Sequence, residues 1–199
     1  MKGVIIAAGY GTRFLPVTKT IPKEMLPIIE KPAIDYILDE FQEAGIKDVI
    51  VITSRRKKVL EDYLDREIEL ESVFHKENNL KKLDKIKVRD NMKFTFIRQQ
   101  EMKGTGHAML LLKSCIKDEP FIVAYPDDLF FHENPCKKLI EHYKKHKMSI
   151  IPVMEIDGDV SSYGVVKVSC AGSDGTMKID KFVEKPPKGK EPSKLISVG

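Results

Sequence analysis

The sequence has few cysteines, no long apolar run and little net charge, and each absence excludes a class of protein. Its three cysteines, Cys115, Cys136 and Cys170, are odd in number and far apart, which excludes a disulfide framework and a CxxC zinc motif. They indicate a reducing compartment, so we expect a cytoplasmic protein. No apolar stretch approaches the ~18 residues of a membrane-spanning helix. Glycines and an arginine stand where a secretory leader would stay apolar, so we expect neither a membrane partner nor a leader.

The charge balance is nearly even, with 34 basic and 30 acidic residues and a net charge of +4. This excess is too weak to indicate nucleic acid as a partner, and an enzyme for anionic metabolites would show the same balance. Hydrophobic residues make up 42% of the chain, which excludes disorder. At roughly 150 residues per domain, the 199 residues predict a single domain, or one domain and part of another.

Apolar runs and amphipathic segments alternate along the chain. Short apolar runs bounded by turn residues, which are typical of buried strands, occur at residues 4–8, 48–53, 94–98, 120–125, 149–154, 163–168 and 179–183. Helical patterns lie between them at residues 33–44, 107–115 and 136–146. This alternation predicts an α/β fold of the Rossmann-like type, with a mostly parallel mixed sheet flanked by helices.

Residues 55–90 differ from the rest, because 20 of these 36 positions are Asp, Glu, Lys or Arg. Leucines and isoleucines keep a helical spacing through the segment, at positions 60, 64, 68, 80 and 83. We interpret the segment as one or two solvated amphipathic helices, with a docking site as the alternative.

A glycine-containing loop follows the first apolar run, with the sequence AAGYGTRFLPVTKTIPKEMLPIIEKP. Gly9 and Gly11 would let the backbone approach a phosphate or a base, although a plain tight turn explains them equally well. The loop lacks the third glycine of a dinucleotide-binding fingerprint, and the P-loop pattern GxxxxGK[ST] is absent. Four prolines exclude a regular helix, so the loop presents Arg13, Lys19 and Lys23 as cations suited to a triphosphate.

This loop resembles the signature of the sugar-1-phosphate nucleotidyltransferases, AAGxGTRxxPxTxxxPKxMLPI, and its PKEMLP form is similar to that of their bacterial uridylyltransferases. The resemblance continues in the order of that family through four further motifs, at residues 98–99 and 103–108, 126–128, 163–166 and 183–186. It therefore covers the whole chain.

The resemblance implies a reaction in which a phosphate oxygen of glucose 1-phosphate attacks the α-phosphorus of UTP in line. The products are UDP-glucose and pyrophosphate, and Mg²⁺ is the implied cofactor. Two alternatives stay open. One is transfer of a thymidylyl, cytidylyl or guanylyl group, and the other is a non-catalytic relative that binds a nucleotide sugar. A homodimer or homotetramer is possible on the same resemblance.

Two side chains point to the nucleotide site by their chemistry. Asp127 follows the fourth apolar run, where an open α/β sheet places its ligands, and a carboxylate there suits Mg²⁺. An Asx turn or helix cap is the alternative, but the resemblance makes Asp127 the metal ligand. Gln99 follows the third run, and its carboxamide complements the O4 and N3–H groups of uracil, unless it is an ordinary surface glutamine.

The resemblance assigns the remaining roles to matching positions. Arg13, Lys23 and Lys185 join Asp127 as the catalytic residues. The residues implied for nucleotide binding are Ala8, Gly9, Gly11, Thr12, Arg13, Gln99 and Gly104. Gly164, Glu184 and Lys185 would bind the sugar phosphate, whereas a β-bulge glycine and an ordinary surface ion pair are the structural alternatives.

The resemblance also implies a division of the chain into a nucleotide-binding part, residues 1–130, and a sugar-phosphate-binding part, residues 131–199. The apolar residues at 195–199 indicate a strand that is just beginning, and the resemblance implies that a second acidic metal ligand lies beyond residue 199. We therefore expect the sugar part to be unfinished and the chain to be truncated.

Residues 136–147 contain two features that resemble binding sites. His142 and His146 have the i, i+4 spacing of a metal-binding pair, but the sequence offers neither the glutamate of HExxH nor a third ligand, so we expect no zinc there. The five lysines of the same segment indicate a solvated helix face and not an RNA-binding patch.

Overall fold

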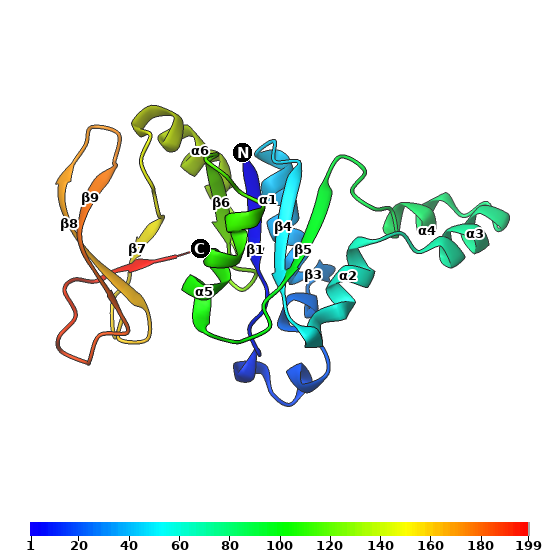
Figure 1. Ribbon diagram of the computed structural model, residues 1–199, viewed down its shortest axis with the longest axis horizontal. Helices are drawn as coiled ribbons and strands as arrows, with labels where there is room; N and C mark the ends of the chain where they lie inside the picture. Colours follow the sequence, from blue (N-terminus) through cyan, green and yellow to red (C-terminus); the bar gives the residue numbers. More distant parts are fainter. Residues whose placement is uncertain (199) are drawn as a thin grey trace. The chain divides into compact units, whose positions relative to one another are not determined.

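A four-stranded parallel sheet forms the centre of residues 1–129, one of two compact units in the computed structural model. The model describes residues 1–198, with the backbone alone at Cys170 and Ala171. The strands are β1 (Lys2–Ile6), β4 (Asp48–Thr53), β5 (Lys93–Arg98) and β6 (Phe121–Ala124). Their order is β5-β4-β1-β6, and every neighbouring pair is parallel (Figure 1). The predicted α/β fold with a parallel sheet is confirmed.

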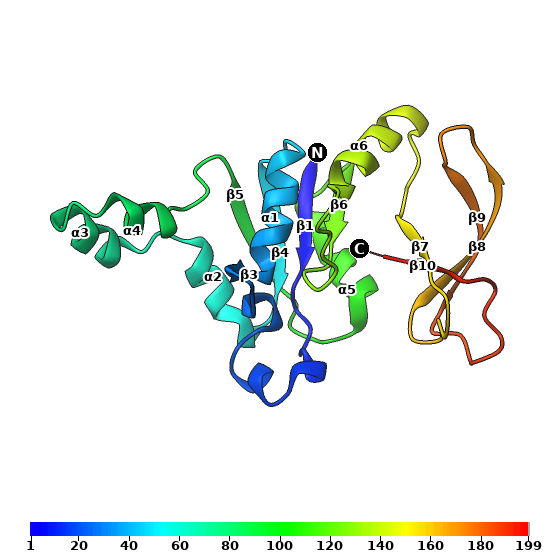
Figure 2. The ribbon, with the colours of Figure 1, turned by 180° about the vertical axis from the view of Figure 1, so that it is seen from behind.

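Helices cover both faces of this sheet (Figures 1 and 2). On one face, α1 (Ala33–Glu43) approaches β1 so closely that a Cβ atom at Gly3 would lie 2.5 Å from the ring of Phe41. On the other face, α5 (Gly104–Leu111) and the 3-10 turn η5 (Leu112–Ser114) contribute to a buried core. The members of that core are Val4, Ile6, Ala8, Ile50, Ile52, Ala108, Leu112 and Ile116. Strand alternation explains the division, because residues 4, 6 and 8 face α5 while residue 3 faces α1.

The loop after β1 contains three short 3-10 turns, η1 (Thr12–Phe14), η2 (Val17–Lys19) and η3 (Lys23–Met25). A two-stranded hairpin of β2 (Pro27–Ile28) and β3 (Lys31–Pro32) then leads into α1. The prediction that prolines prevent a regular helix here is confirmed, since proline removes the N–H that a continuing helix needs.

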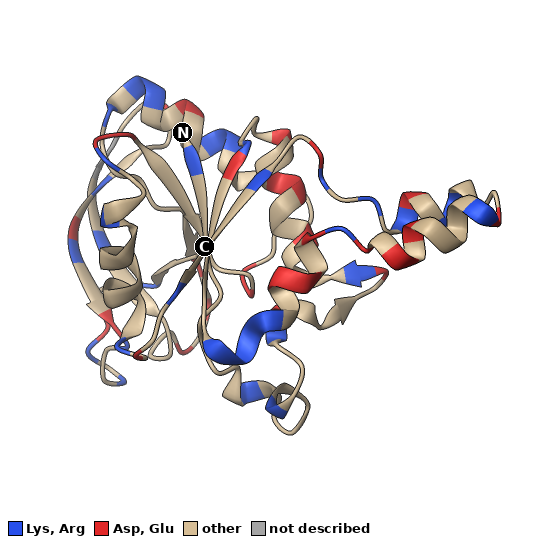
Figure 3. Ribbon diagram, turned by 45° about the vertical axis from the view of Figure 1, so that its right-hand side comes forward, with Lys and Arg blue, Asp and Glu red and all other residues tan. Residues whose placement is uncertain are grey.

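The charged segment forms three α-helices rather than the expected one or two: α2 (Lys58–Leu64), α3 (Ile68–Lys76) and α4 (Leu80–Lys85). They follow the 3-10 turn η4 (Arg55–Lys57), and charges of both signs run along them (Figure 3). Leu60 is fully buried, but Ile68 and Leu80 are exposed, so the apolar spacing does not produce one continuous buried stripe.

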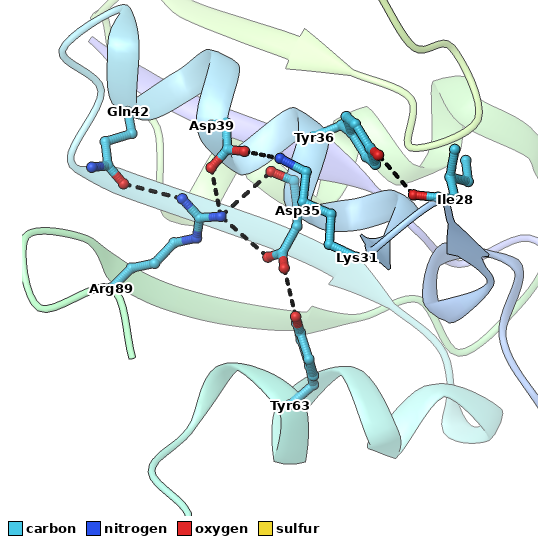
Figure 4. Close-up of polar contacts among 8 residues, drawn as sticks. All are labelled: Ile28, Lys31, Asp35, Tyr36, Asp39, Gln42, Tyr63 and Arg89. Carbon is cyan, nitrogen blue, oxygen red and sulfur yellow. Dashed lines mark hydrogen bonds and ion pairs between the residues drawn. The ribbon is translucent and has the colours of Figure 1, made fainter. Parts of the chain in front are cut away.

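A polar network attaches this segment to α1 (Figure 4). The guanidinium of Arg89 lies 2.7 Å from a carboxylate oxygen of Asp39 and 3.2 Å from one of Asp35. The hydroxyl of Tyr63, on α2, donates a 2.6 Å hydrogen bond to Asp35. Burial raises the pKa of Tyr63, and this hydrogen bond raises it further, so the phenol stays protonated and remains a donor.

The second unit, from residue 130 onward, combines helix α6 (Pro135–His146) with a separate four-stranded antiparallel sheet. Its strands are β7 (Val153–Glu155), β8 (Gly164–Ala171), β9 (Met177–Glu184) and β10 (Leu195–Ser197), in the order β7-β10-β8-β9. The strand expected at 195–199 is present as β10, which pairs on both sides, while Gly199 lies outside the described residues. No helix in the described part of the chain is both long and apolar enough to cross a membrane.

Candidate functional site

The strand order reverses at β1, because the chain proceeds from β1 outward to β4 and β5 and then returns to β6 on the other side of β1. At such a switch point, the loops after two neighbouring strands diverge and leave a crevice at their carboxyl ends. The glycine loop follows β1, and Asp127 lies in the turn after β6. The strand order thus places the predicted nucleotide loop and the predicted metal ligand at one edge of the sheet.

An ion pair connects these two segments. The Nζ atom of Lys23 lies 2.7 Å from Oδ2 of Asp127. The Lys23 side chain is 17% exposed and that of Asp127 is 40% exposed, so the carboxylate remains accessible from solvent. Two of the residues predicted to be catalytic are therefore in direct contact, although they belong to segments far apart in the sequence.

A buried ion pair supports the loop beside Lys23. Both carboxylate oxygens of Glu24 lie 2.6 Å from Nζ of Lys57, and the two side chains are almost completely buried. Burial lowers the pKa of Lys57, while Glu24 opposes that shift. Asp127 and Lys23 also act on Lys57, in opposite directions, so these four charges form one electrostatic cluster. Neither Glu24 nor Lys57 stands out in the sequence, because a lysine within a run of charged residues is ordinarily solvated.

Gly11 is needed for the turn that begins η1. Its φ of 66° is in the left-handed region, and a Cβ atom there would lie 3.2 Å from the side chain of Thr18. The hydroxyl of Thr18 donates a 2.7 Å hydrogen bond to the carbonyl of Gly11, which closes the loop on itself. The backbone geometry of a tight turn is thus sufficient to explain why position 11 is glycine, independently of any ligand that the loop binds. Gly9, in contrast, has no atom within 4 Å of a hypothetical Cβ, so the space beside it is open.

The other predicted residues of the loop are solvent-facing. Arg13 and Thr12 are exposed, and the described residues provide no hydrogen bond or ion pair to the Arg13 guanidinium. A hollow beside Gly9 is lined by residues that include Lys19 and Arg56. The Arg56 guanidinium donates a 2.8 Å hydrogen bond to the carbonyl of Lys19, which holds the two segments together. Ala8, by contrast, is buried, so only its backbone could contact a ligand.

Gln99 is buried and fixed by internal hydrogen bonds. Its Nε2 atom donates to the carbonyl of Gly104 at 3.1 Å and lies 3.0 Å from Nδ1 of His107. The structure thus brings together the two residues predicted to recognise the base. It also shows a constraint that the sequence did not reveal, because the amide nitrogen is already used. The amide oxygen has no hydrogen bond from any described residue, which leaves it as the group that could accept the N3–H of uracil.

Gly164 and Glu184 are direct neighbours in the antiparallel sheet of the second unit. A Cβ atom at Gly164 would lie 2.7 Å from the ring of Phe182 and 2.8 Å from Oγ of Ser197, so packing alone requires glycine there. The register shifts between β8 and β9 fall at Lys167 and beyond, so Gly164 is not the β-bulge that we considered as its alternative role.

Lys185 adopts a left-handed backbone conformation, with φ of 47°, directly after β9. Its N–H donates a 3.0 Å hydrogen bond to the carbonyl of Tyr163, which holds this conformation. The left-handed region costs a residue with a Cβ atom about 1–2 kcal/mol, and such outliers gather at functional sites. Its ammonium is exposed and lies 3.7 Å from Glu184, so both charged groups are accessible to a ligand.

The profile of the nucleotidyl transferase family matches residues 2–199. The chain belongs to this family. It is 42% identical over 201 residues to the UTP–glucose-1-phosphate uridylyltransferase of Bacillus subtilis (strain 168), a match that covers 100% of this chain and 68% of the relative. It is 41% identical to UTP–glucose-1-phosphate uridylyltransferase 2 of Staphylococcus saprophyticus, again over 100% of this chain and over 69% of the relative.

Two solved structures of UDP-glucose pyrophosphorylases are also similar to this chain. A UTP-bound UGPase from Acinetobacter baumannii is 36% identical, with a TM-score of 0.91 over 100% of this chain and 72% of that chain. A UDP-glucose pyrophosphorylase in complex with UDP-glucose is 42% identical, with a TM-score of 0.85 over 100% of this chain and 74% of that chain. The resemblance seen in the sequence motifs is thereby confirmed for the fold and the family, while the role of each site residue stays a prediction.

Proposed function

We propose that the chain transfers a uridylyl group from UTP to glucose 1-phosphate, with UDP-glucose and pyrophosphate as products. The observation that carries this proposal is the 42% identity to a uridylyltransferase over the whole of this chain and 68% of that relative. The accessible carboxylate and ammonium of Asp127 and Lys23 at the switch point of the sheet support it, because phosphoryl chemistry needs such charges there.

The chemistry requires charge neutralisation more than proton transfer. The attacking phosphate oxygen is already an anion, so no general base has to activate it. The two substrates repel each other, and charge develops on the departing pyrophosphate, so positioned cations lower the barrier. Lys23 is held by the loop at η3, and Arg13 is exposed and free to turn toward phosphate oxygens. We assign both cations to the triphosphate.

Asp127 fits the requirements of a Mg²⁺ ligand. Mg²⁺ is usually held by one or two carboxylates, substrate phosphates and water rather than by an all-protein cage. The half-exposed carboxylate of Asp127 provides such a donor, and its present partner is an ammonium that can pair with phosphate instead. When bound, Mg²⁺ would supply positive charge to the phosphates, and the role of this chain is to hold that charge beside Lys23.

Recognition of the base is assigned to Gln99 and the backbone around it. The amide oxygen of Gln99 accepts the N3–H of uracil. The amide nitrogen of the same side chain donates to the carbonyl of Gly104 and so fixes the start of α5. Backbone groups of Ala8 and Gly9 contact the same base, since the Ala8 side chain is buried and the space beside Gly9 is open. Gly11 and Thr12 shape the loop over the phosphates.

The sugar phosphate is assigned to residues of the second unit. Gly164 offers its backbone without a side chain, and the Glu184 carboxylate accepts hydrogen bonds from sugar hydroxyls. Lys185 provides the cation for the phosphate, and its left-handed backbone is the feature that supports this role.

We further propose that the protein acts in the cytoplasm and assembles as a homodimer or homotetramer. Among the described residues, Cys115 and Cys136 form no disulfide, whereas the side chain of Cys170 lies outside the described residues. Light scattering on purified protein would measure the assembly.

The proposed activity is tested by pyrophosphate release. UTP, dTTP, CTP and GTP are each supplied with glucose 1-phosphate or galactose 1-phosphate in the presence of Mg²⁺. We expect turnover with UTP and glucose 1-phosphate to exceed that of every other pair. A preference for another nucleotide would overturn the uridylyl assignment. Tight UDP-glucose binding without turnover of any pair would favour a regulatory relative.

A further inference from the structure

Two histidines and an aspartate that have no role in the proposed reaction converge within the second unit. His142 and His146 lie on one face of α6, since residues four apart in a helix are neighbours. Asp174 belongs to the turn between β8 and β9, which lies beside the C-terminal end of α6 (Figures 1 and 2). One potential ligand atom from each of the three residues lies within 4.8 Å of the others, and all three side chains are half-buried. The third ligand that the sequence did not offer is thus supplied by the fold.

The ligand atoms face a common point. Nε2 of His146 lies 2.9 Å from Oδ2 of Asp174. The hydroxyl of Thr176 lies 3.1 Å from Nδ1 of His142 and 3.5 Å from Nε2 of His146, so these two nitrogens point toward the same oxygen. The two imidazole rings are nearly parallel, with an interplanar angle of 10°.

This arrangement is close to what a tetrahedral zinc ion requires. Zinc bonds to nitrogen and oxygen are about 2.0–2.2 Å long, which places the ligand atoms of a tetrahedral site about 3.4 Å apart. The present separations, from 2.9 Å to at most 4.8 Å, bracket that value, so we expect side-chain rotations to complete the site. Two imidazoles and one carboxylate favour zinc over Mg²⁺, which prefers an all-oxygen set.

We propose that His142, His146 and Asp174 form a binding site for a zinc-like divalent transition ion, with a fourth position filled by water or by the Thr176 hydroxyl. The ion joins α6 to the turn between β8 and β9, and so links helix and sheet inside the second unit. This site is separate in chemistry and in residues from the Mg²⁺ site proposed at Asp127.

Lys145 competes for the carboxylate of this site. Its ammonium forms an ion pair with Oδ2 of Asp174, the oxygen nearest to His146. Its side chain is 60% exposed, so it can turn into solvent when an ion binds. Solvent-exposed ion pairs stabilise a protein only slightly. The competition from Lys145 is therefore weak, and removing its ammonium should tighten zinc binding by only about 1.5- to 5-fold.

The experiment uses untagged protein, stripped of metal, with Zn²⁺ or Co²⁺ as the probe. Zinc affinity is measured by competition with a chromophoric chelator, and Co²⁺ reports its coordination by visible absorption. We expect one ion per chain and the intense bands of tetrahedral Co²⁺, displaced by zinc and unaffected by excess Mg²⁺. Each of His142→Ala, His146→Gln and Asp174→Asn should weaken zinc by more than the roughly 10–100-fold that an outer-shell change costs.

Two controls separate this site from adventitious binding. His75→Ala removes an exposed histidine of α3 and should leave zinc affinity unchanged. Lys145→Gln should strengthen binding slightly, and this gain should disappear in an Asp174→Asn background if it comes from release of the Asp174 carboxylate. The proposal is overturned if Asp174→Asn binds zinc as wild type does, because the two histidines would then act as a simple surface chelate. An octahedral Co²⁺ spectrum of the wild-type protein would also overturn the proposed tetrahedral site.

Discussion

At the scale of single residues, the contact between Lys23 and Asp127 predicts that turnover depends on the charge of Asp127. Asp127→Asn keeps the shape of the side chain but removes the charge that would hold Mg²⁺ and pair with Lys23. By comparison with the loss of one electrostatic contact to a transition state, turnover should fall by about 10²–10³. Pyrophosphate release at saturating substrates measures it, and UTP affinity without metal should change far less. Asp128 is the next residue in the same turn. Near-normal turnover of Asp127→Asn, together with a large loss in Asp128→Asn, would transfer the metal role to Asp128.

The internal bonds of Gln99 allow base recognition to be separated from a structural role. Gln99→Ala removes the oxygen proposed to accept from uracil N3–H, and it also releases Gly104 and His107. Loss of one such hydrogen bond should reduce the preference for UTP over CTP by about 10-fold. The ratio of kcat/KM for the two nucleotides measures this. If Gln99 only supports α5, both nucleotides weaken equally and their ratio does not change.

Among the residues, the sequence allowed prediction of the motif positions but not of their partners. The motifs indicate Asp127 and Lys23 as separate candidates, and only the fold shows that they form an ion pair. Local charge around Lys57 indicates exposure, but the side chain is buried because it pairs with Glu24 from a distant loop. Asp174 likewise approaches the two histidines only through the fold. Tertiary proximity, which local patterns do not contain, accounts for each omission.

At the scale of elements, the Glu24–Lys57 pair joins the glycine loop to η4 and predicts a strong dependence of stability on both partners. Glu24→Gln leaves a buried ammonium without its counter-charge, which should destabilise the fold by about 3–5 kcal/mol. The double variant Glu24→Leu/Lys57→Met buries no charge and should recover much of that loss. Urea unfolding measures both.

An exposed pair provides the matched control for this prediction. Lys87 and Asp90 are 3.7 Å apart and both are solvent-exposed, so Lys87→Met should change stability by no more than about 1 kcal/mol. A Glu24→Gln variant as stable as this control would show that the buried pair contributes nothing to the loop.

The network between α1 and Arg89 predicts how stability responds to acid. Burial raises the pKa of Asp39, but its bonds with Lys31 and Arg89 outweigh burial and lower the pKa below the ordinary value of 3.8 (Figure 4). A carboxyl group with a lowered pKa stabilises the fold above its ordinary pKa, and this contribution is lost as pH falls through the lowered value. Wild type should therefore exceed Asp39→Asn in unfolding free energy at neutral pH, and the difference should shrink below pH 3.8. A difference that stays constant under acid would contradict the assignment.

Prediction of elements from the sequence succeeded where one continuous apolar run formed one buried strand. Residues 48–53 were predicted as a strand and form β4 with the same bounds. The run at 149–154 was less informative, because β7 covers only Val153–Glu155 and most of its residues are exposed. The helix expected from residue 107 begins at Gly104, whose positive φ gives no helical signal in a sequence.

At the scale of the whole molecule, the two compact units allow two ligands to be followed separately by hydrogen exchange. A ligand that binds only the native state slows exchange where it suppresses local opening. Mg²⁺ with UTP should protect amides in residues 9–25 and 99–106, where the loop and the start of α5 carry the nucleotide contacts proposed above. Zinc should protect the second half of α6 and residues 172–176, and with both ligands present each pattern should persist. Mass spectrometry of peptic peptides resolves these segments. Protection by UTP confined to residues from 130 onward would contradict the nucleotide site proposed in the first unit. Protection by zinc confined to residues 1–129 would contradict the zinc site proposed in the second unit.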